Sequence, residues 1–219
     1  SDNNYDLVFS DGFDLYYRLY KSGTNSYDPP VQFAAGDPAV VFPNTYDVKA
    51  YDYNGDGLRD IFVNQTGTLI YGENSGDLNN LFPSWSMVTN TNGSHITGRE
   101  TFAFCDFNNN GYPSFLTLIP TGQGDWQIIY YEGMPPSIPG VPEFSPTGQL
   151  LSNIDVEHLV KPNIDIIDGD CDGDCDIFVT ANDKLYMYEN YGGLIGNLPD
   201  FEKANLIVNP FGVSGIAGF

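Results

Sequence analysis

The chain repeats a short acidic loop motif, and this repeat constrains the fold more than any other feature of the sequence. The motif reads DYNGDGLRDIFV at residues 52–63, DFNNNGYPSFLT at 106–117 and DGDCDGDCDIFV at 168–179, and residues 1–9 match its second half. The ninth motif positions are Asp6, Asp60, Ser114 and Asp176, at spacings of 54, 54 and 62 residues. Self-similarity at such a period predicts a fold assembled from one repeated supersecondary unit.

The rest of each unit repeats as well. An apolar run precedes each loop, a second run begins at the ninth position, and a Tyr-rich segment and a Pro/Phe segment follow, the latter at 30–33, 82–85, 142–144 and 199–201. These runs are short, β-branched or aromatic, and bounded by Gly, Pro, Asn and Asp, as strands are. Four strands per unit are typical of a propeller blade. We therefore predict an all-β, single-domain β-propeller over 1–219 with four-stranded antiparallel blades at about 1–45, 46–99, 100–161 and 162–211.

The two ends of the sequence complement each other. Ser1 falls at position 4 of a motif, so the first unit holds strands two to four, whereas the run at 215–219 takes the place that 101–105 holds before a loop. We expect 212–219 to be a closing strand, because unpaired edges promote association. Closure within one chain gives four blades, and pairing between chains gives a head-to-tail ring or filament. A start without Met predicts a mature or trimmed product.

The loops carry oxygen ligands at regular spacing. Side chains at positions 1, 3 and 5 of a tight loop can converge on one point, and Gly at position 6 permits the turn. Hard oxygen ligands suit Ca²⁺, which accepts about six to eight of them. The carbonyl of position 7 and the side chain of position 9 complete the predicted sets. These are Asp52, Asn54, Asp56, Leu58 and Asp60; Asp106, Asn108, Asn110 and Tyr112; and Asp168, Asp170, Asp172, Asp174 and Asp176.

Two other kinds of loop have similar residues at this spacing. An Asx-turn without metal uses the same residue types, but five Asp within 168–176 would repel one another without a cation. An EF-hand needs Glu at position 12, where this chain has Val63, Thr117 and Val179. The second loop should bind more weakly, because Ser114 replaces the ninth-position Asp and two of its ligands are neutral Asn.

These residues resemble the Asp-x-Asp/Asn-x-Asp-Gly-x-x-Asp-Ile/Leu loop of the FG-GAP and VCBS repeats, which are β-propellers related to the integrin α-chain head. The resemblance extends over essentially the whole chain and is strongest in the first and third loops. It implies that each loop joins the first two strands of a blade and holds one calcium ion. It also implies roles in cell adhesion, matrix contact or sugar binding.

The charge balance restricts the partners. The chain has 29 acidic and 8 basic residues, a formal net charge of −21. With no basic stripe to neutralise phosphates, nucleic acid is excluded as a partner, and anionic lipid surfaces are disfavoured. No apolar run reaches the roughly 18 residues of a membrane-spanning helix. So large an imbalance favours bound cations that offset self-repulsion.

Cysteines and sequons give two further expectations. Cys171 and Cys175 lie in the third loop and form either a small disulfide or two free thiols; we favour the disulfide, with Cys105 free and buried. Asn64 and Asn92 begin N-glycosylation sequons.

No nucleophile motif, phosphate-binding loop or paired catalytic carboxylate stands apart from the loops. We therefore expect no enzyme but an extracellular, calcium-binding structural or adhesion module for protein or glycan ligands, with a self-assembling surface filament as one form. The alternatives are a lectin and an accessory domain of a secreted hydrolase.

Overall fold

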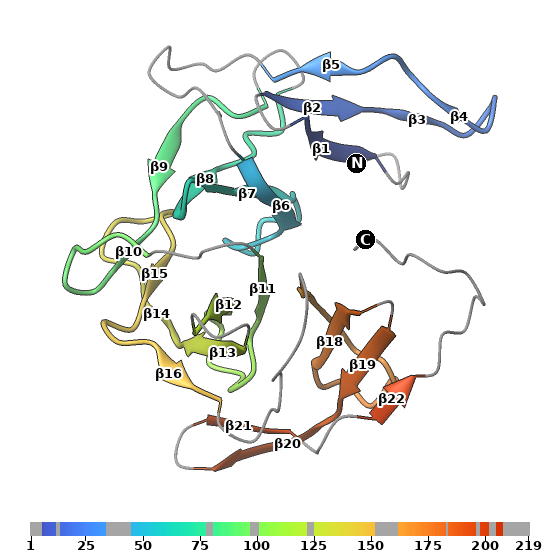
Figure 1. The fold of residues 1–219 in the computed structure, drawn as a ribbon. Coiled ribbons are helices and arrows are strands. Elements are labelled where there is room, and N and C mark those ends of the chain that lie inside the picture. The colour runs from blue at the N-terminus through green and yellow to red at the C-terminus, as the bar shows by residue number, and fades with distance from the viewer. Residues whose placement is uncertain are drawn as a thin grey trace.

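A computed structural model describes residues 6–11, 14–33, 45–77, 81–96, 101–121, 125–151, 162–182, 184–195, 198–201 and 205–207. The regular elements of these residues are all strands (Figure 1). No helix in the described part of the chain could therefore span a membrane. The predicted all-β class is confirmed.

Three of the repeat units form a four-stranded antiparallel sheet each. In every case the strands pair in chain order, so each loop motif joins the first strand to the second. The sheets comprise β6 (Thr45–Tyr51), β7 (Asp60–Gln65), β8 (Thr68–Gly72) and β9 (Trp85–Met87); β11 (Phe102–Cys105), β12 (Ser114–Pro120), β13 (Trp126–Tyr131) and β16 (Gln149–Leu150); and β17 (Asn163–Ile167), β18 (Asp176–Ala181), β19 (Lys184–Tyr188) and β22 (Asn205–Ile207).

The first unit shows three strands within the described residues: β1 (Leu7–Ser10), β2 (Leu15–Arg18) and β5 (Val31–Gln32). A small hairpin of β3 (Tyr20–Lys21) and β4 (Ser26–Tyr27) extends from it. By its place in the motif, β1 corresponds to β7, β12 and β18, the second strands of the other units. The predicted closing strand at 212–219 lies outside the described residues.

The predicted fourth strands of the last two units are wrong. The Pro/Phe segments at 142–144 and 199–201 lie in β15 (Glu143–Phe144) and β21 (Leu198–Phe201), neither of which belongs to a repeat sheet. β15 pairs with β10 (Thr89–Asn90) and β14 (Gly133–Met134), whereas β21 pairs with β20 (Asn190–Ile195). These insertions precede the true fourth strands β16 and β22, which explains why apolar content alone misplaced them.

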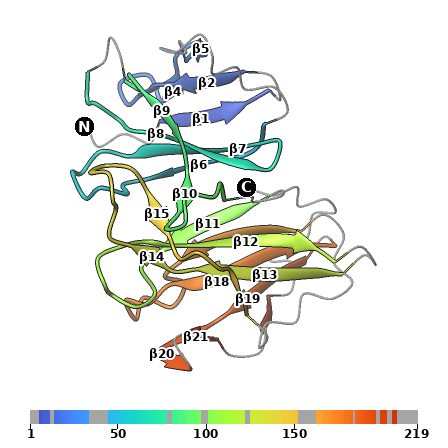
Figure 2. The same cartoon turned by 90° about the vertical axis from the view of Figure 1, so that its left-hand side faces the viewer.

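Successive sheets pack face to face, with an apolar core between each pair (Figures 1 and 2). β7 illustrates the arrangement, because Ile61 and Val63 face the first unit whereas Phe62 faces the third. All three side chains are at most 2% exposed. The sequence of a strand covered on both faces is a continuous apolar run and does not alternate with polar residues. The residues IFV of this motif are such a run.

Polar side chains join the first strands of three consecutive units. The Thr101 hydroxyl lies 3.0 Å from Asp47 Oδ2 and also contacts Asn163 Oδ1. The Phe102 N–H donates to the same Asp47 oxygen at 3.2 Å. Burial raises the pKa of Asp47, an effect that the nearby Lys49 partly offsets. The network therefore joins the first strands of the three sheets at the cost of a partly buried carboxyl group.

This raised pKa has a measurable consequence. The folded state holds the Asp47 proton more tightly than the unfolded state, so the contribution to stability is present at low pH and is lost as pH rises through the folded pKa. Asp47→Asn keeps an acceptor oxygen but removes the charge. We expect the variant to be more stable than wild type at pH 7 and the difference to shrink as the pH falls to about 4, near the ordinary pKa of Asp. Thermal melts across this range test it, and a pH-independent difference would contradict it.

Candidate metal-binding loops

Each loop connects the first two strands of its own sheet, and the strands pair at equivalent motif positions in all three. The residue before position 1 pairs with position 9: Tyr51 with Asp60, Cys105 with Ser114, and Ile167 with Asp176. Positions 1 to 8 therefore form the connection itself, at the same end of the first two strands in each sheet. Because the flanking residues always pair in the same way, equivalent motif positions start from equivalent places in the backbone.

The position 1 carboxylate holds the loop backbone from inside. In the first loop, Asp52 accepts hydrogen bonds from the N–H groups of Gly55 at 2.9 Å and Gly57 at 3.0 Å. Asp106 and Asp168 also accept two N–H groups each, but from positions 5 and 6, the position 6 donor lying at 2.8 and 3.2 Å. A carboxylate oxygen has further lone pairs, so these bonds orient the group without using up its capacity for a cation.

Positions 3 and 5 repeat one pattern in all three loops. The position 3 oxygen accepts the N–H of position 5, at 3.0 Å from Asp56 to Asn54 and at 3.2 Å in the other two loops. The position 5 oxygen accepts the N–H of position 7 at 2.7, 2.7 and 2.9 Å. The oxygens at positions 1, 3 and 5 are therefore all held by the backbone of their own loop.

Glycine at position 6 is required by the backbone. Gly57, Gly111 and Gly173 have φ of +85°, +84° and +98°, a region that residues with a Cβ atom rarely adopt. A Cβ atom at any of the three would meet nothing within 4 Å. The constraint is therefore the left-handed turn itself, as the motif predicted.

The third loop brings three carboxylates together. One oxygen each from Asp168, Asp170 and Asp176 lies within 4.8 Å of the others. Desolvation, with the charges of Asp172 and Asp176, raises the pKa of Asp170. An all-oxygen donor set at this spacing suits a hard divalent cation such as Ca²⁺, so the predicted ligands at positions 1, 3 and 9 fit the ion. In the described residues, the other two loops do not form such a carboxylate group.

Position 9 has a second role that the sequence did not indicate. Asp60 and Asp176 are fully buried, and each accepts two backbone N–H groups. Asp60 binds those of Tyr53 at 3.2 Å and Asn74 at 2.9 Å. Burial raises the pKa of Asp60, while these two hydrogen bonds lower it. The side chain therefore connects the loop to the segment that follows the third strand.

The same connection recurs in the other units. Asp6 accepts the Tyr20 N–H at 2.8 Å and Asp176 accepts the Asn190 N–H at 2.9 Å, each 14 residues later, as in the Asp60 pair. Ser114 replaces the carboxylate in the second loop, and its hydroxyl accepts the Gly133 N–H at 3.2 Å. Ser114 thus keeps the structural contact and gives up the charge.

Two glutamates next to the loops were missed. Glu73 Oε1 accepts the Asn54 side-chain amide at 3.2 Å, and Glu132 Oε1 accepts that of Asn108 at 2.9 Å. The signal was present, because a Glu ends the Tyr-rich segment at 73, 132 and 189. The repeat of the Tyr-rich segment predicts only a strand, and this glutamate lies just after it.

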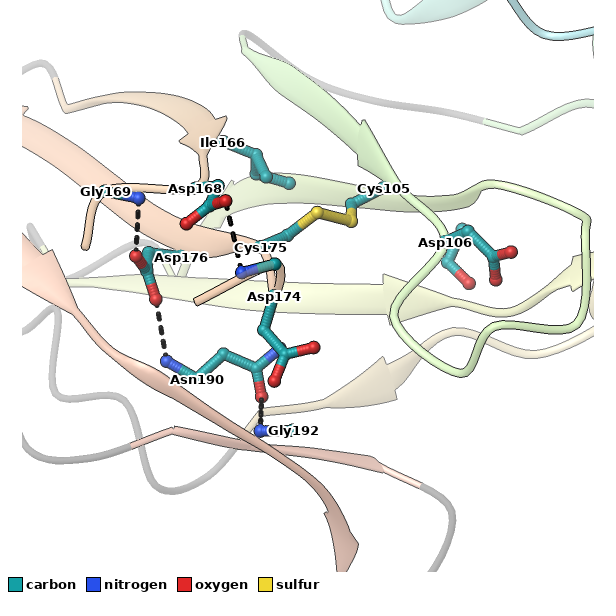
Figure 3. Close-up of a disulfide and its surroundings, with 12 residues drawn as sticks. Cys105, Asp106, Ile166, Asp168, Gly169, Asp174, Cys175, Asp176, Asn190 and Gly192 are labelled. Atoms are coloured by element: carbon teal, nitrogen blue, oxygen red, sulfur yellow. Dashed lines mark hydrogen bonds between the residues drawn. A yellow bond between two sulfur atoms is a disulfide. The ribbon is translucent and has the colours of Figure 1, made fainter. Parts of the chain in front are cut away.

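The disulfide differs from the prediction. Cys175 pairs with Cys105, 70 residues earlier, and Cys171 is free and exposed (Figure 3). Cys171 adopts a left-handed φ of +67° in the exposed part of the loop, whereas Cys105 and Cys175 lie in or against the core between the last two sheets. Proximity in sequence was therefore misleading. The bond links the second and third loops directly beside Asp106 and Asp176.

The two sequons lie in opposite environments. Asn64 on β7 is fully buried, and its side-chain oxygen accepts the Gly67 N–H at 3.2 Å. Asn92 is exposed in the turn that follows β10. A glycan fits the folded chain at Asn92 and not at Asn64.

Comparison with known families agrees with the repeat. Residues 52–117 match the family model of the FG-GAP-like repeat, a segment that contains the first and second loops. The chain therefore carries an FG-GAP-like repeat, and the resemblance inferred from its motifs is confirmed over these residues. Such a repeat indicates a β-rich module of the extracellular, adhesion-associated kind. No curated protein matched the chain.

The disulfide pairing gives the next prediction. Replacing Cys105 and Cys175 together with Ala should lower the free energy of unfolding by about 2–4 kcal/mol, because the bond restricts a long segment of the unfolded chain. Cys171→Ala should leave the stability unchanged. Denaturant melts measure the difference, and mass spectrometry of non-reduced peptides checks the pairing. A linked Cys171–Cys175 peptide would show that our assignment is wrong.

Proposed function

We propose that this chain is an extracellular calcium-binding β-propeller that serves as a structural and adhesion module. The observation that carries the proposal is the group of Asp168, Asp170 and Asp176 oxygens within 4.8 Å of one another, on a loop whose geometry recurs in the FG-GAP-like segment. Calcium bound there would replace carboxylate repulsion by attraction and hold the hairpin rigid. The loops at the strand ends of neighbouring units would then present fixed surfaces to a protein or glycan partner.

The propeller arrangement is supported by how the sheets follow one another. Each sheet packs on the next through its own core, from the blue sheet to the orange sheet in Figure 1. β1 differs from its counterparts, because Leu7 is 42% and Phe9 36% exposed whereas Ile61 and Val63 are at most 2% exposed. Ile61 and Val63 pack on the sheet of the preceding unit, so within the proposal a preceding sheet also covers this face of β1. Closure within the chain supplies that sheet from the fourth unit in a four-bladed ring, and pairing between chains supplies it from another copy in a filament.

Calcium binding is tested by thermal stability. A ligand bound only by the folded state stabilises it by mass action, by about 2.7 kcal/mol at a free concentration one hundred times Kd. We expect Ca²⁺ to raise Tm, EDTA to reverse the change and Mg²⁺ to act poorly, because it requires near-octahedral geometry.

Asp172→Asn should remove part of this gain, because it deletes a ligand charge at position 5. Asp200→Asn is the matched control, since Asp200 lies on β21 outside the loops and its loss changes the net charge equally. A wild-type melting curve that neither Ca²⁺ nor EDTA moves would sink the proposal.

A lectin is the second candidate, and one pocket favours it. A hollow of about 220 Å³ lies between the turn after β10 and the segment before β15. Glu143 lines it and is 9% exposed, and its Oε2 accepts the Ser137 N–H at 2.6 Å. Thr89, Thr91 and Pro142 also line the hollow. Hydroxyl and carboxylate groups beside an apolar wall suit one neutral sugar ring.

A glycan array tests this second function. We expect binding to neutral glycans that Thr91→Val weakens by about fivefold, the value of one hydrogen bond of about 1 kcal/mol. Thr147→Val, at an exposed threonine outside the pocket, should have no effect. Equal loss in both variants, or no glycan bound by wild type, counts against the lectin.

A further inference from the structure

A glutamate follows the third strand of two consecutive units and binds the same loop position in both. Glu73 comes directly after β8, and Glu132 directly after β13. The acceptor oxygen lies 3.2 Å from Asn54 Nδ2 in one unit and 2.9 Å from Asn108 Nδ2 in the other. The contact is thus present twice, in independent sequence surroundings, between the third strand and position 3 of the loop.

This contact decides which way the Asn side chain points. An amide has one oxygen, which can bind a cation, and one NH₂ group, which cannot. Nδ2 is held by the glutamate, and in the first loop it also donates to Asp56 Oδ2 at 3.2 Å. Oδ1 therefore accepts the N–H of position 5, from Asp56 at 3.0 Å and from Asn110 at 3.2 Å. Rotating the amide by half a turn would set NH₂ against that N–H and oxygen against the carboxylate. The glutamate therefore favours the orientation that a cation needs.

In the second loop the same segment orients a second amide. The Gly133 carbonyl accepts a hydrogen bond from Asn110 Nδ2 at 3.3 Å, and the Gly133 N–H donates to Ser114 at 3.2 Å. A Cβ atom at Gly133 would lie 2.3 Å from the carbonyl oxygen of Tyr112, so only glycine allows this approach. Residues 132–133 thus contact the loop at positions 3, 5 and 9. This loop has a single Asp at its ligand positions. The side-chain oxygens of Asn108 and Asn110 both accept N–H groups of the loop.

The third loop provides an internal comparison. Its position 3 is Asp170, whose two side-chain oxygens can both bind a cation, so that no amide has to be oriented. Glu189 occupies the place after β19 that Glu73 and Glu132 occupy in their units. If the glutamate acts through the amide, its importance should differ between the loops with Asn and the loop with Asp.

We propose that Glu73 and Glu132 are positioning residues that fix the amide oxygens of Asn54 and Asn108 toward a bound calcium ion. The inference rests on the calcium-binding function proposed above. It also changes the expectation for the second loop, whose neutral ligands are held in place before the ion arrives. Glu132 and Gly133 thereby offset part of the loss in calcium affinity that comes from having no carboxylate at positions 3, 5 and 9.

The test is a Ca²⁺ titration that resolves the three loops. The backbone amide signals of Gly57, Gly111 and Gly173 in ¹⁵N–¹H NMR spectra report one loop each. Glu132→Leu should weaken binding at Gly111 by about 10- to 100-fold, as the loss of an outer-shell partner does, and leave the other two curves unchanged. Glu132→Gln should stay within about threefold of wild type, because its amide oxygen still accepts the hydrogen bond.

Two controls separate positioning from charge and from misfolding. Glu189→Leu removes the same charge beside the third loop and should change the Gly173 curve less than Glu132→Leu changes that of Gly111. Glu73→Leu, read at Gly57, repeats the test in the first loop should Glu132→Leu fail to fold.

Equal losses for the Gln and Leu variants would show that the charge matters, and the positioning role would be wrong. No loss in either Leu variant would overturn the inference as well. If no glycine signal of the wild-type protein responds to Ca²⁺, the calcium function itself fails, and that outcome is distinct from both.

Discussion

The contact on which the repeat depends is a hydrogen bond from a backbone N–H group to a polar side chain at position 9 of the motif, which is buried in the second, third and fourth units. It joins Tyr20 to Asp6, Asn74 to Asp60, Gly133 to Ser114, and Asn190 to Asp176. Each bond ties the start of the second strand to the segment after the third strand. A buried carboxylate is costly unless it is fully hydrogen-bonded, so Asp60 and Asp176 specify the hairpin register in their units.

The loops hold part of the acidic side chains behind the net charge of −21 in defined positions. Their carboxylates are not spread over the surface at random, because positions 1, 3 and 5 each accept N–H groups of their own loop. Hydrogen bonds from the backbone thus stabilise the acidic side chains and orient them before any cation binds. In the second loop, neutral amides replace most of these carboxylates, and the neighbouring segment 132–133 takes over the orienting task.

The sequence predicted what is periodic and missed what is not. The loops, the all-β class and the continuous apolar second strands followed from the motif, because its spacing reflects a hairpin frame and two-sided burial. The insertions that contain β15 and β21 interrupt the period, so the fourth strands at 149–150 and 205–207 were misplaced. The Cys105–Cys175 bond and the Glu132–Asn108 contact depend on how separate segments approach in space, which local spacing does not encode.

The disulfide gives the molecule an uneven response to force. Cys105 and Cys175 enclose 70 residues of separation that contain β12 to β17, including most of the third sheet. Tension applied at the two ends of the chain is transmitted across the sulfur–sulfur bond and bypasses this segment. The first two sheets and the strands after Cys175 can be drawn out, whereas the enclosed segment cannot lengthen the chain until the bond is reduced. A module that holds surfaces together under shear would thus keep one mechanically shielded part.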